Sequence, residues 1–234
     1  MRLPLYISVP HAGTRIPPEV QDLCLLSRDD ILTDRDTGVD TIYFPLQKYA
    51  AGFSTTDIAR SLLDLNRAPD DIGGNGVIKE HTCSNVPVYR IFPDKTLVRN
   101  LLHRYYFPFH EKLTAGGTDP TIRLGVDCHT MADVGPPVSP DPGRQRPLIC
   151  LSSGDGSCPK KWISGLADCL AAAFGEPVAH NMPFRGGYIC RLHAAEMPWV
   201  QVEISQTTAY STQWKRDCIL EGLHDFCQTV LARA

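Results

Sequence analysis

The chain has 234 residues, of which 43% are hydrophobic and 21% are charged, and its formal net charge is −3 at pH 7. This length and composition are typical of a globular protein with one sizeable core and rather short for two domains, so we expect a single domain over residues 1–234. Lysines and arginines are scattered along the chain, without the basic run that a nucleic-acid partner would require. No apolar stretch reaches membrane-spanning length and the first residues do not form a signal peptide, so we expect a cytoplasmic protein without a membrane partner.

The nine cysteines are spread along the chain without forming a Cys-x-x-Cys pair. Several lie in apolar patterns such as LADCLAAAF, where a thiol acts as a small hydrophobic group. We therefore expect neither a disulfide framework nor a cysteine zinc site, which agrees with a reducing compartment.

Apolar runs typical of strands alternate with helical patterns along the chain. In chain order we expect a strand at 6–9, a helix at 39–51 that Pro45 interrupts, a strand-like core within 58–67, a helix at 96–113 with a kink at Pro108, a strand at 123–130, a proline-rich loop at 133–147, a strand at 147–153, a helix at 162–174, strands at 186–193 and 199–205, and a helix at 213–232. This alternation predicts an α/β fold with a largely parallel or mixed central sheet flanked by helices.

Polar residues that can carry chemistry lie at or near the ends of three predicted strands. His11 follows the first strand, His129 stands at the end of the strand at 123–130, and Glu203 lies within the apolar run WVQVEIS. Ligands of open α/β sheets bind beyond the carboxyl ends of the strands, so we expect these side chains to share one site. A buried carboxylate such as Glu203 is costly without a partner or a chemical role.

An acidic segment at residues 33–40 adds carboxylates at the entrance of a predicted helix, namely Asp34, Asp36 and Asp40. Two imidazoles and one carboxylate are sufficient to hold a catalytic zinc ion with water in the fourth position. The same residues also suit structural roles, in which the histidines cap a turn or bind backbone and Glu203 pairs with an arginine. Residue types and spacing alone leave both interpretations open.

The segment IARSLLDLNRAPDD brings together Arg60, Asn66 and Arg67. The planar guanidinium of Arg67 beside the Asn66 amide suits a carboxylate, and an arginine also stabilises a developing oxyanion. The alternative is a structural salt bridge from Arg67 to one of three nearby residues, Asp64, Asp70 or Asp71.

The segment NMPFRGGYICR is a second candidate for contact with a substrate. Gly186 and Gly187 permit a positive φ or a close approach of the backbone to a ligand, and Arg185 and Tyr188 flank them. The alternative is a hairpin with a surface arginine.

Taken together, these segments resemble the N-formylglutamate amidohydrolase family. The resemblance spans residues 8–205 and is carried, in order, by SVPHAGTRIPPE, DTGVDTIY, ARSLLDLNRAPDD, DCHTM, NMPFRGGYICR and VQVEIS. That family is similar to a branch of the zinc carboxypeptidase and aspartoacylase superfamily. The resemblance implies a zinc-exopeptidase-like (phosphorylase/hydrolase-like) fold, with a mixed eight-stranded sheet flanked by helices.

The resemblance also implies a division of roles within the site. It implies metal ligation by His11 and His129, general-base catalysis by Glu203, oxyanion stabilisation by Arg60, and binding of a substrate carboxylate by Asn66 and Arg67. We add Arg185, Gly187 and Tyr188 as expected substrate contacts.

One position departs from the superfamily's pattern. Its His-x-x-Glu motif supplies two metal ligands, but the third residue after His11 is Thr14. The carboxylate ligand must then come from elsewhere, and we expect Asp36, with Asp40 and Asp34 as alternatives. The expected cofactor is Zn²⁺, although a set of two histidines and a carboxylate accepts other divalent metals.

The implied function is that of a metal-dependent amidohydrolase that cleaves a small N-acyl amino acid with a free carboxylate. N-formyl-L-glutamate, which would yield formate and L-glutamate, is the leading candidate. The alternatives are a hydrolase of another N-acyl amino acid or peptide, and an inactive carboxylate-binding protein, which the missing glutamate after His11 suggests. The sequence does not predict an oligomeric state.

Overall fold

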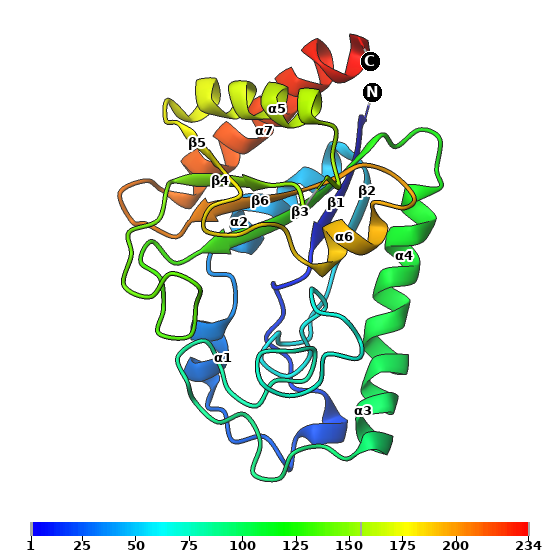
Figure 1. The fold of residues 1–234 in the computed structure, drawn as a ribbon, viewed down its shortest axis with the longest axis vertical. Helices are drawn as coiled ribbons and strands as arrows, with labels where there is room; N and C mark the ends of the chain where they lie inside the picture. The colour runs from blue at the N-terminus through cyan, green and yellow to red at the C-terminus, as the bar shows by residue number, and fades with distance from the viewer. Residues whose placement is uncertain (1, 155, 234) are drawn as a thin grey trace.

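A six-stranded mixed sheet lies at the centre of the protein, as the computed structural model in Figure 1 shows for residues 2–154 and 156–233. The strand order is β2-β1-β3-β6-β4-β5. Strands β2, β1, β3 and β6 run parallel, whereas β4 is antiparallel to β6 and parallel to β5. The strands are β1 (Leu3–Val9), β2 (Ala50–Thr55), β3 (Leu124–Met131), β4 (Ile149–Ser152), β5 (Val178–His180) and β6 (Trp199–Ser205). The predicted mixed α/β sheet is confirmed, with six strands in the described part of the chain where the resemblance implied eight.

Helices cover both faces of this sheet (Figure 1). Residues of α2, α5 and α7 pack into the core on one face, and residues of α3, α4 and α6 pack into the core on the other. The α-helices are α1 (Arg28–Asp34), α2 (Val39–Tyr43), α3 (Lys95–Leu101), α4 (Phe107–Gly117), α5 (Lys160–Phe174), α6 (Tyr188–His193) and α7 (Thr212–Thr229). Among residues 2–154 and 156–233, no helix has both the length and the apolar character needed to cross a membrane.

The two-residue repeat of the central strands separates an apolar face from a polar one. On β3 and β6, alternate residues enter the core beneath α5 and α7, namely Leu124, Val126, Cys128, Val200, Val202 and Ile204. The residues between them point to the opposite face and include Asp127, His129, Gln201 and Glu203. Because β1, β3 and β6 are parallel, their carboxyl ends meet at one edge, and the polar residues gather there.

The segment 186–193, predicted to be a strand, instead leads into helix α6. Gly187 is extended, with φ −80° and ψ −175°, and directly precedes the helix. The buried residues Ile189, Cys190 and His193 follow helical spacing. A short apolar run of this length suits either a strand or a helix, so the strand prediction was wrong.

The predicted helix at 39–51 is divided, and the strand that follows it was missed. Segment 39–51 comprises α2, a 3₁₀ turn over Phe44–Lys48 that contains Pro45, and the beginning of the missed strand β2 at Ala50. Proline lacks the N–H that an α-helix would use at this point. The strand β5 was also missed, because three residues are too few to show a period. Segment 58–67 forms isolated bridges at Ile58 and Ala59 but no strand.

The long amphipathic segment at 96–113 is helical but not uniform. It comprises α3, a π-helical turn over Leu102–Tyr106, and α4, which carries Pro108 in its first turn. Because the backbone is helical on both sides of this junction, Pro108 removes one hydrogen bond from a continuous helix, and the π-helical turn directly precedes it.

Candidate active site

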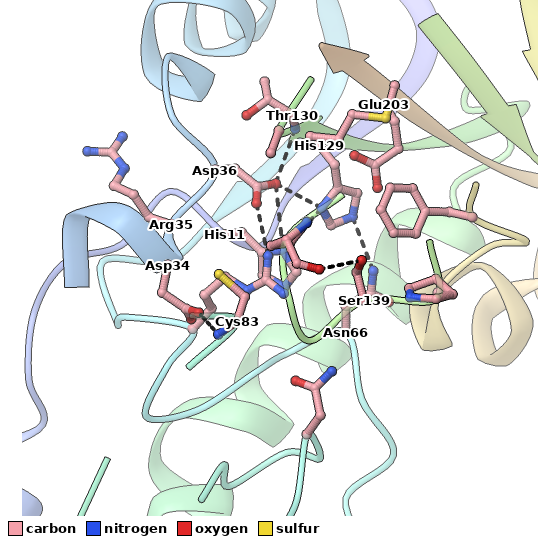
Figure 2. Close-up of a pocket in the computed structure, with 18 of the residues that line it drawn as sticks. His11, Asp34, Arg35, Asp36, Asn66, Cys83, His129, Thr130, Ser139 and Glu203 are labelled. Atoms are coloured by element: carbon pink, nitrogen blue, oxygen red, sulfur yellow. Dashed lines mark hydrogen bonds and ion pairs between the residues drawn. The ribbon is translucent and has the colours of Figure 1, made fainter. Parts of the chain in front are cut away.

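A cavity of about 690 Å³ opens at the carboxyl edge of the sheet. Its lining includes the predicted residues His11, Asp36, Arg60, Arg67 and Glu203, together with the proline-rich loop at 136–140. The sequence-based expectation that residues far apart in the chain share one edge of the sheet therefore agrees with this arrangement (Figure 2).

The imidazoles of His11 and His129 meet at the floor of this cavity. Their Nδ1 atoms lie 3.1 Å apart, and Asp36 Oδ2 lies 3.1 Å from His129 Nδ1 and 3.6 Å from His11 Nδ1. All three residues are buried, and one ligand atom from each lies within 4.8 Å of the others. This buried His-Asp-His group can bind a metal ion.

Local backbone contacts bring Asp36 to the histidines. The Asp36 N–H donates to the carbonyl of His11, and the Thr130 N–H donates to Asp36 Oδ2 at 3.2 Å. The two alternative carboxylates face elsewhere. Asp34 accepts the N–H of Cys83 at 2.7 Å, and Asp40 lies 3.3 Å from Arg35 on the surface.

A glycine fixes the path of the loop that carries His11. A Cβ on Gly13 would lie 2.2 Å from the carbonyl oxygen of Ile58, so only glycine permits this approach. The loop after β1 is thereby held against the segment that carries Arg60. Thr14, which stands where the superfamily has its glutamate, is exposed to solvent.

Each candidate ligand histidine has a carboxylate on its other ring nitrogen. Asp64 Oδ1 lies 2.8 Å from His11 Nε2, and Asp127 Oδ2 lies 2.9 Å from His129 Nε2. A carboxylate only accepts hydrogen bonds, so both Nε2 atoms carry hydrogen, and each imidazole in its neutral form directs its Nδ1 lone pair toward Asp36. This carboxylate–histidine pairing is the arrangement that orients metal-binding imidazoles.

The charges around this group favour an additional cation. Five carboxylates are buried here, those of Asp34, Asp36, Asp64, Asp127 and Glu203. Within the described residues, the basic side chains other than histidine in ion-pair contact with them are Arg60 and Lys79, and burial lowers the pKa of Lys79. Burial lowers the pKa of His129, but the charge of Asp127, the hydrogen bonds to Asp127 and Asp36, and the charge of Glu203 outweigh it and raise that pKa well above its usual value. An environment that stabilises positive charge between two imidazoles and a carboxylate fits a divalent metal ion.

Glu203 lies beside His129 on the neighbouring strand, in direct register with it. Its side chain is 5% exposed, and its Oε1 accepts a hydrogen bond from Gln201 Nε2 at 2.8 Å. Burial raises the pKa of Glu203 to about 7, a shift that His129 and Arg60 oppose and Asp36 increases. A carboxyl group with this pKa at the wall of a cavity is suited to act as a general base.

Arg60 reaches the same cavity from the segment before α3. Its Nη1 lies 3.0 Å from Asp36 Oδ1 and its Nη2 lies 3.6 Å from Asp64 Oδ2, while 21% of its side chain is exposed. The guanidinium therefore stands beside the candidate metal-binding group and still faces the cavity, where it can stabilise negative charge on a substrate oxygen.

Asn66 and Arg67 are adjacent in sequence but have different surroundings. The buried Asn66 amide donates to Asp127 Oδ2 at 3.0 Å and accepts from the Ile189 N–H at 2.8 Å. The Arg67 guanidinium lines the cavity and donates to the carbonyl oxygens of Asn75 and Asn66. Among the described residues it forms no salt bridge. Arg67 thus retains capacity for a carboxylate, whereas Asn66 supports the Asp127–His129 pair.

The segment around the paired glycines contributes unevenly to the cavity. Arg185 lies exposed at its wall, and Gly187 lines it. A Cβ on Gly187 would lie 2.2 Å from Asn66 Nδ2, so this glycine allows a close approach to protein rather than to a ligand. Tyr188 packs against the core beside α4 and is not part of the cavity wall.

Four residues of the site had no assigned role in the sequence-based hypothesis, namely Asp64, Asp127, Gln201 and Lys79. Gln201 shares the polar face of β6 with Glu203, and a spacing of two residues on a predicted strand is the signal that would have indicated it. Lys79, which lies 3.2 Å from Asp64 Oδ2, comes from an irregular loop whose pattern gives no such signal.

The fold and the site define an α/β protein with a buried candidate metal centre and an adjacent buried carboxyl group, that of Glu203. A family model described as N-formylglutamate amidohydrolase matches residues 3–210. The chain therefore belongs to the N-formylglutamate amidohydrolase family.

The names of two relatives agree with this assignment, and two solved structures share the fold. The chain is 27% identical over 226 residues to N-formylglutamate deformylase of Pseudomonas aeruginosa, covering 91% of this chain and 84% of the relative. It is 26% identical over 222 residues to N-formylglutamate deformylase of Pseudomonas putida, covering 88% of this chain and 82% of the relative. The crystal structure of N-formylglutamate amidohydrolase from Ralstonia eutropha JMP134 shares the fold, with a TM-score of 0.76 and 21% identity. The match covers 100% of this chain and 96% of that one. The crystal structure of a gene product of Agrobacterium tumefaciens also shares the fold, with a TM-score of 0.77 and 18% identity. The match covers 99% of this chain and 90% of that one.

Proposed function

We propose that this protein is a zinc-dependent amidohydrolase that converts N-formyl-L-glutamate and water into formate and L-glutamate. The observation that carries the proposal is the meeting of His11, Asp36 and His129 in one buried group, with Glu203 in register beside it. Membership of the family and the names of the Pseudomonas relatives support the choice of substrate. We further propose that it acts in the cytoplasm, because nine free thiols suit a reducing compartment.

The donor set fits zinc, which favours four-coordinate sites built from imidazole nitrogen and carboxylate oxygen. His11, Asp36 and His129 would hold the ion, and their carboxylate partners Asp64 and Asp127 would keep the two imidazoles oriented. Bound there, the metal would supply Lewis acidity, which makes water more acidic and polarises a carbonyl group.

The side chains around this group have complementary tasks. Glu203 accepts a proton from the attacking water while the new C–O bond to the formyl carbon forms. Arg60 stabilises the negative charge that develops on the carbonyl oxygen. Glu203 then delivers the proton to the nitrogen of the leaving glutamate as the C–N bond breaks, and formate and L-glutamate remain.

Arg67 is proposed to hold a carboxylate of the substrate. Its guanidinium lies at the cavity wall and is bound only to backbone carbonyls within the described residues. Arginine binds carboxylates through two parallel hydrogen bonds, which would align the formyl group with Glu203. Arg185, at the cavity wall, is the candidate for a second carboxylate of the substrate.

The test is formate release by the purified, zinc-loaded protein from N-formyl-L-glutamate, N-acetyl-L-glutamate and N-formyl-L-alanine. We expect the highest kcat/KM with N-formyl-L-glutamate and loss of turnover after chelation, restored by zinc. Preference for another acyl group or amino acid would replace the substrate assignment. A zinc-loaded protein that binds these compounds without turnover would support the inactive binding protein instead.

A further inference from the structure

The side chain of Gln201 links a backbone amide at the cavity wall to Glu203. Gln201 is 4% exposed and, two residues before Glu203 on β6, lies on the same face of the sheet. Its Oε1 accepts the N–H of Gly187 at 2.6 Å, and its Nε2 donates to Glu203 Oε1 at 2.8 Å. Both the oxygen and the nitrogen of the Gln201 amide therefore form hydrogen bonds within the protein.

The direction of these two hydrogen bonds is fixed by chemistry. A backbone N–H only donates, so the end of the Gln201 amide that faces Gly187 must be the oxygen. The amide nitrogen then faces Glu203 and can only donate to it. One oxygen of Glu203 is thereby held as an acceptor, whereas Oε2 has no hydrogen-bond partner within the described residues and belongs to a side chain that lines the cavity.

Gly187, which binds the oxygen of the Gln201 amide, is held in place by close packing against Asn66. Gly187 lies so close to Asn66 that a Cβ would approach Asn66 Nδ2 to 2.2 Å, and Asn66 in turn donates to Asp127, the partner of His129. One continuous network thus supports the base and a candidate metal ligand together. The terminal torsion of a glutamate is otherwise broad, so the orientation of its carboxylate needs such an external contact.

We propose that Gln201 is a positioning residue that sets the rotation of the Glu203 carboxylate and assigns proton transfer to Oε2. This role rests on the proposed function, in which Glu203 is the general base. Loss of the contact would leave substrate binding largely intact and slow the chemical step, because a misplaced base lowers the rate without removing contacts to the substrate.

The experiment compares Gln201→Met with wild type and with Gln228→Met, which makes the same change on the exposed side of α7. We expect kcat for N-formyl-L-glutamate to fall about 10- to 100-fold in Gln201→Met, as for other outer-shell partners, with KM within about threefold and zinc content unchanged. In a Glu203→Gln background, adding Gln201→Met is expected to change the residual kcat by less than about threefold, because both changes act through one group. Should Gln201→Met fail to fold, Gln201→Asn keeps a neutral amide that is one CH₂ shorter and cannot bridge Gly187 and Glu203, and we expect the same fall in kcat.

Two results would overturn the role of Gln201. One is a folded Gln201 variant whose kcat matches wild type. The other is a double variant that loses as much activity relative to Glu203→Gln as the single variant loses relative to wild type. A zinc-loaded wild-type protein that leaves N-formyl-L-glutamate intact would overturn the proposed function and, with it, the role of Gln201.

Discussion

Replacing Asp64 with asparagine perturbs the candidate metal centre without touching a ligand. Asp64 Oδ1 accepts from His11 Nε2 at 2.8 Å and from the Asn66 N–H at 2.9 Å, while Oδ2 lies 3.2 Å from Lys79 Nζ and 3.6 Å from Arg60 Nη2. In Asp64→Asn the oxygen still accepts from His11, but a negative charge disappears and an NH₂ group faces two cations. The His11 imidazole becomes a weaker donor to a metal, and the site becomes more positive by one unit of charge.

The expected effect follows from the role of such outer carboxylates. Their loss lowers metal affinity about 10- to 100-fold, or about 1.4 to 2.7 kcal/mol of binding free energy. The assay is a competition titration of the metal-free protein with zinc and a chromophoric chelator at fixed pH. The matched control is Asp168→Asn, which removes a carboxylate from the exposed side of α5 and is expected to leave the zinc Kd unchanged. A folded Asp64→Asn protein with the zinc affinity of wild type would refute this account of how His11 is oriented.

Three further predictions concern the base, the packing and the pH dependence of stability. Glu203→Gln is expected to lower kcat by about 10²- to 10⁴-fold with zinc content retained, because it removes only a proton acceptor; full turnover would contradict the role of Glu203. Gly187→Ala places a Cβ 2.2 Å from Asn66 Nδ2 and is expected to lower the free energy of unfolding by about 1–3 kcal/mol in urea titrations; an unchanged midpoint would contradict this close contact. Burial raises the pKa of Glu203 from 4.5 to about 7, so the folded, metal-free protein holds a proton there that the unfolded chain releases above pH 4.5. The contribution of Glu203 to stability therefore falls as pH rises from 4.5 to about 7. The free energy of unfolding of metal-free Glu203→Gln should therefore rise relative to that of metal-free wild type between pH 4.5 and about 7. Above about pH 7 this relative gain should be of the order of 3 kcal/mol. A difference between the two proteins that does not change with pH would contradict the assignment.

The parts of the site that the sequence predicted are those carried by regular strands. His129 and Glu203 lie on long apolar runs whose two-residue period survives in β3 and β6, so their common face followed from the pattern. Because Thr14 cannot replace a carboxylate, a ligand from elsewhere was expected, and the resemblance of DTGVD to the family's acidic segment favoured Asp36. The structure brings Asp36, rather than Asp34 or Asp40, to the histidines.

The remainder depended on contacts between distant segments. Asn66 was expected to bind a substrate carboxylate; it lines the cavity, and its amide also bonds to Asp127 and to the Ile189 N–H, contacts that the sequence did not predict. Tyr188 was expected to contact a substrate because it flanks the paired glycines; as the first residue of α6 it packs against the core instead. Lys79 could not be predicted at all, because nothing in its local sequence distinguishes a buried lysine from a solvated one.

The central claim is that His11, Asp36 and His129 hold one divalent ion beside Glu203. The most direct test is anomalous X-ray diffraction from crystals of the zinc-loaded protein, recorded on both sides of the zinc absorption edge. We predict one strong anomalous peak, which places a zinc ion within bonding distance of Nδ1 of both histidines and of a carboxylate oxygen of Asp36. A fully loaded protein whose zinc lies elsewhere, with the two imidazoles still in direct contact, would contradict the account.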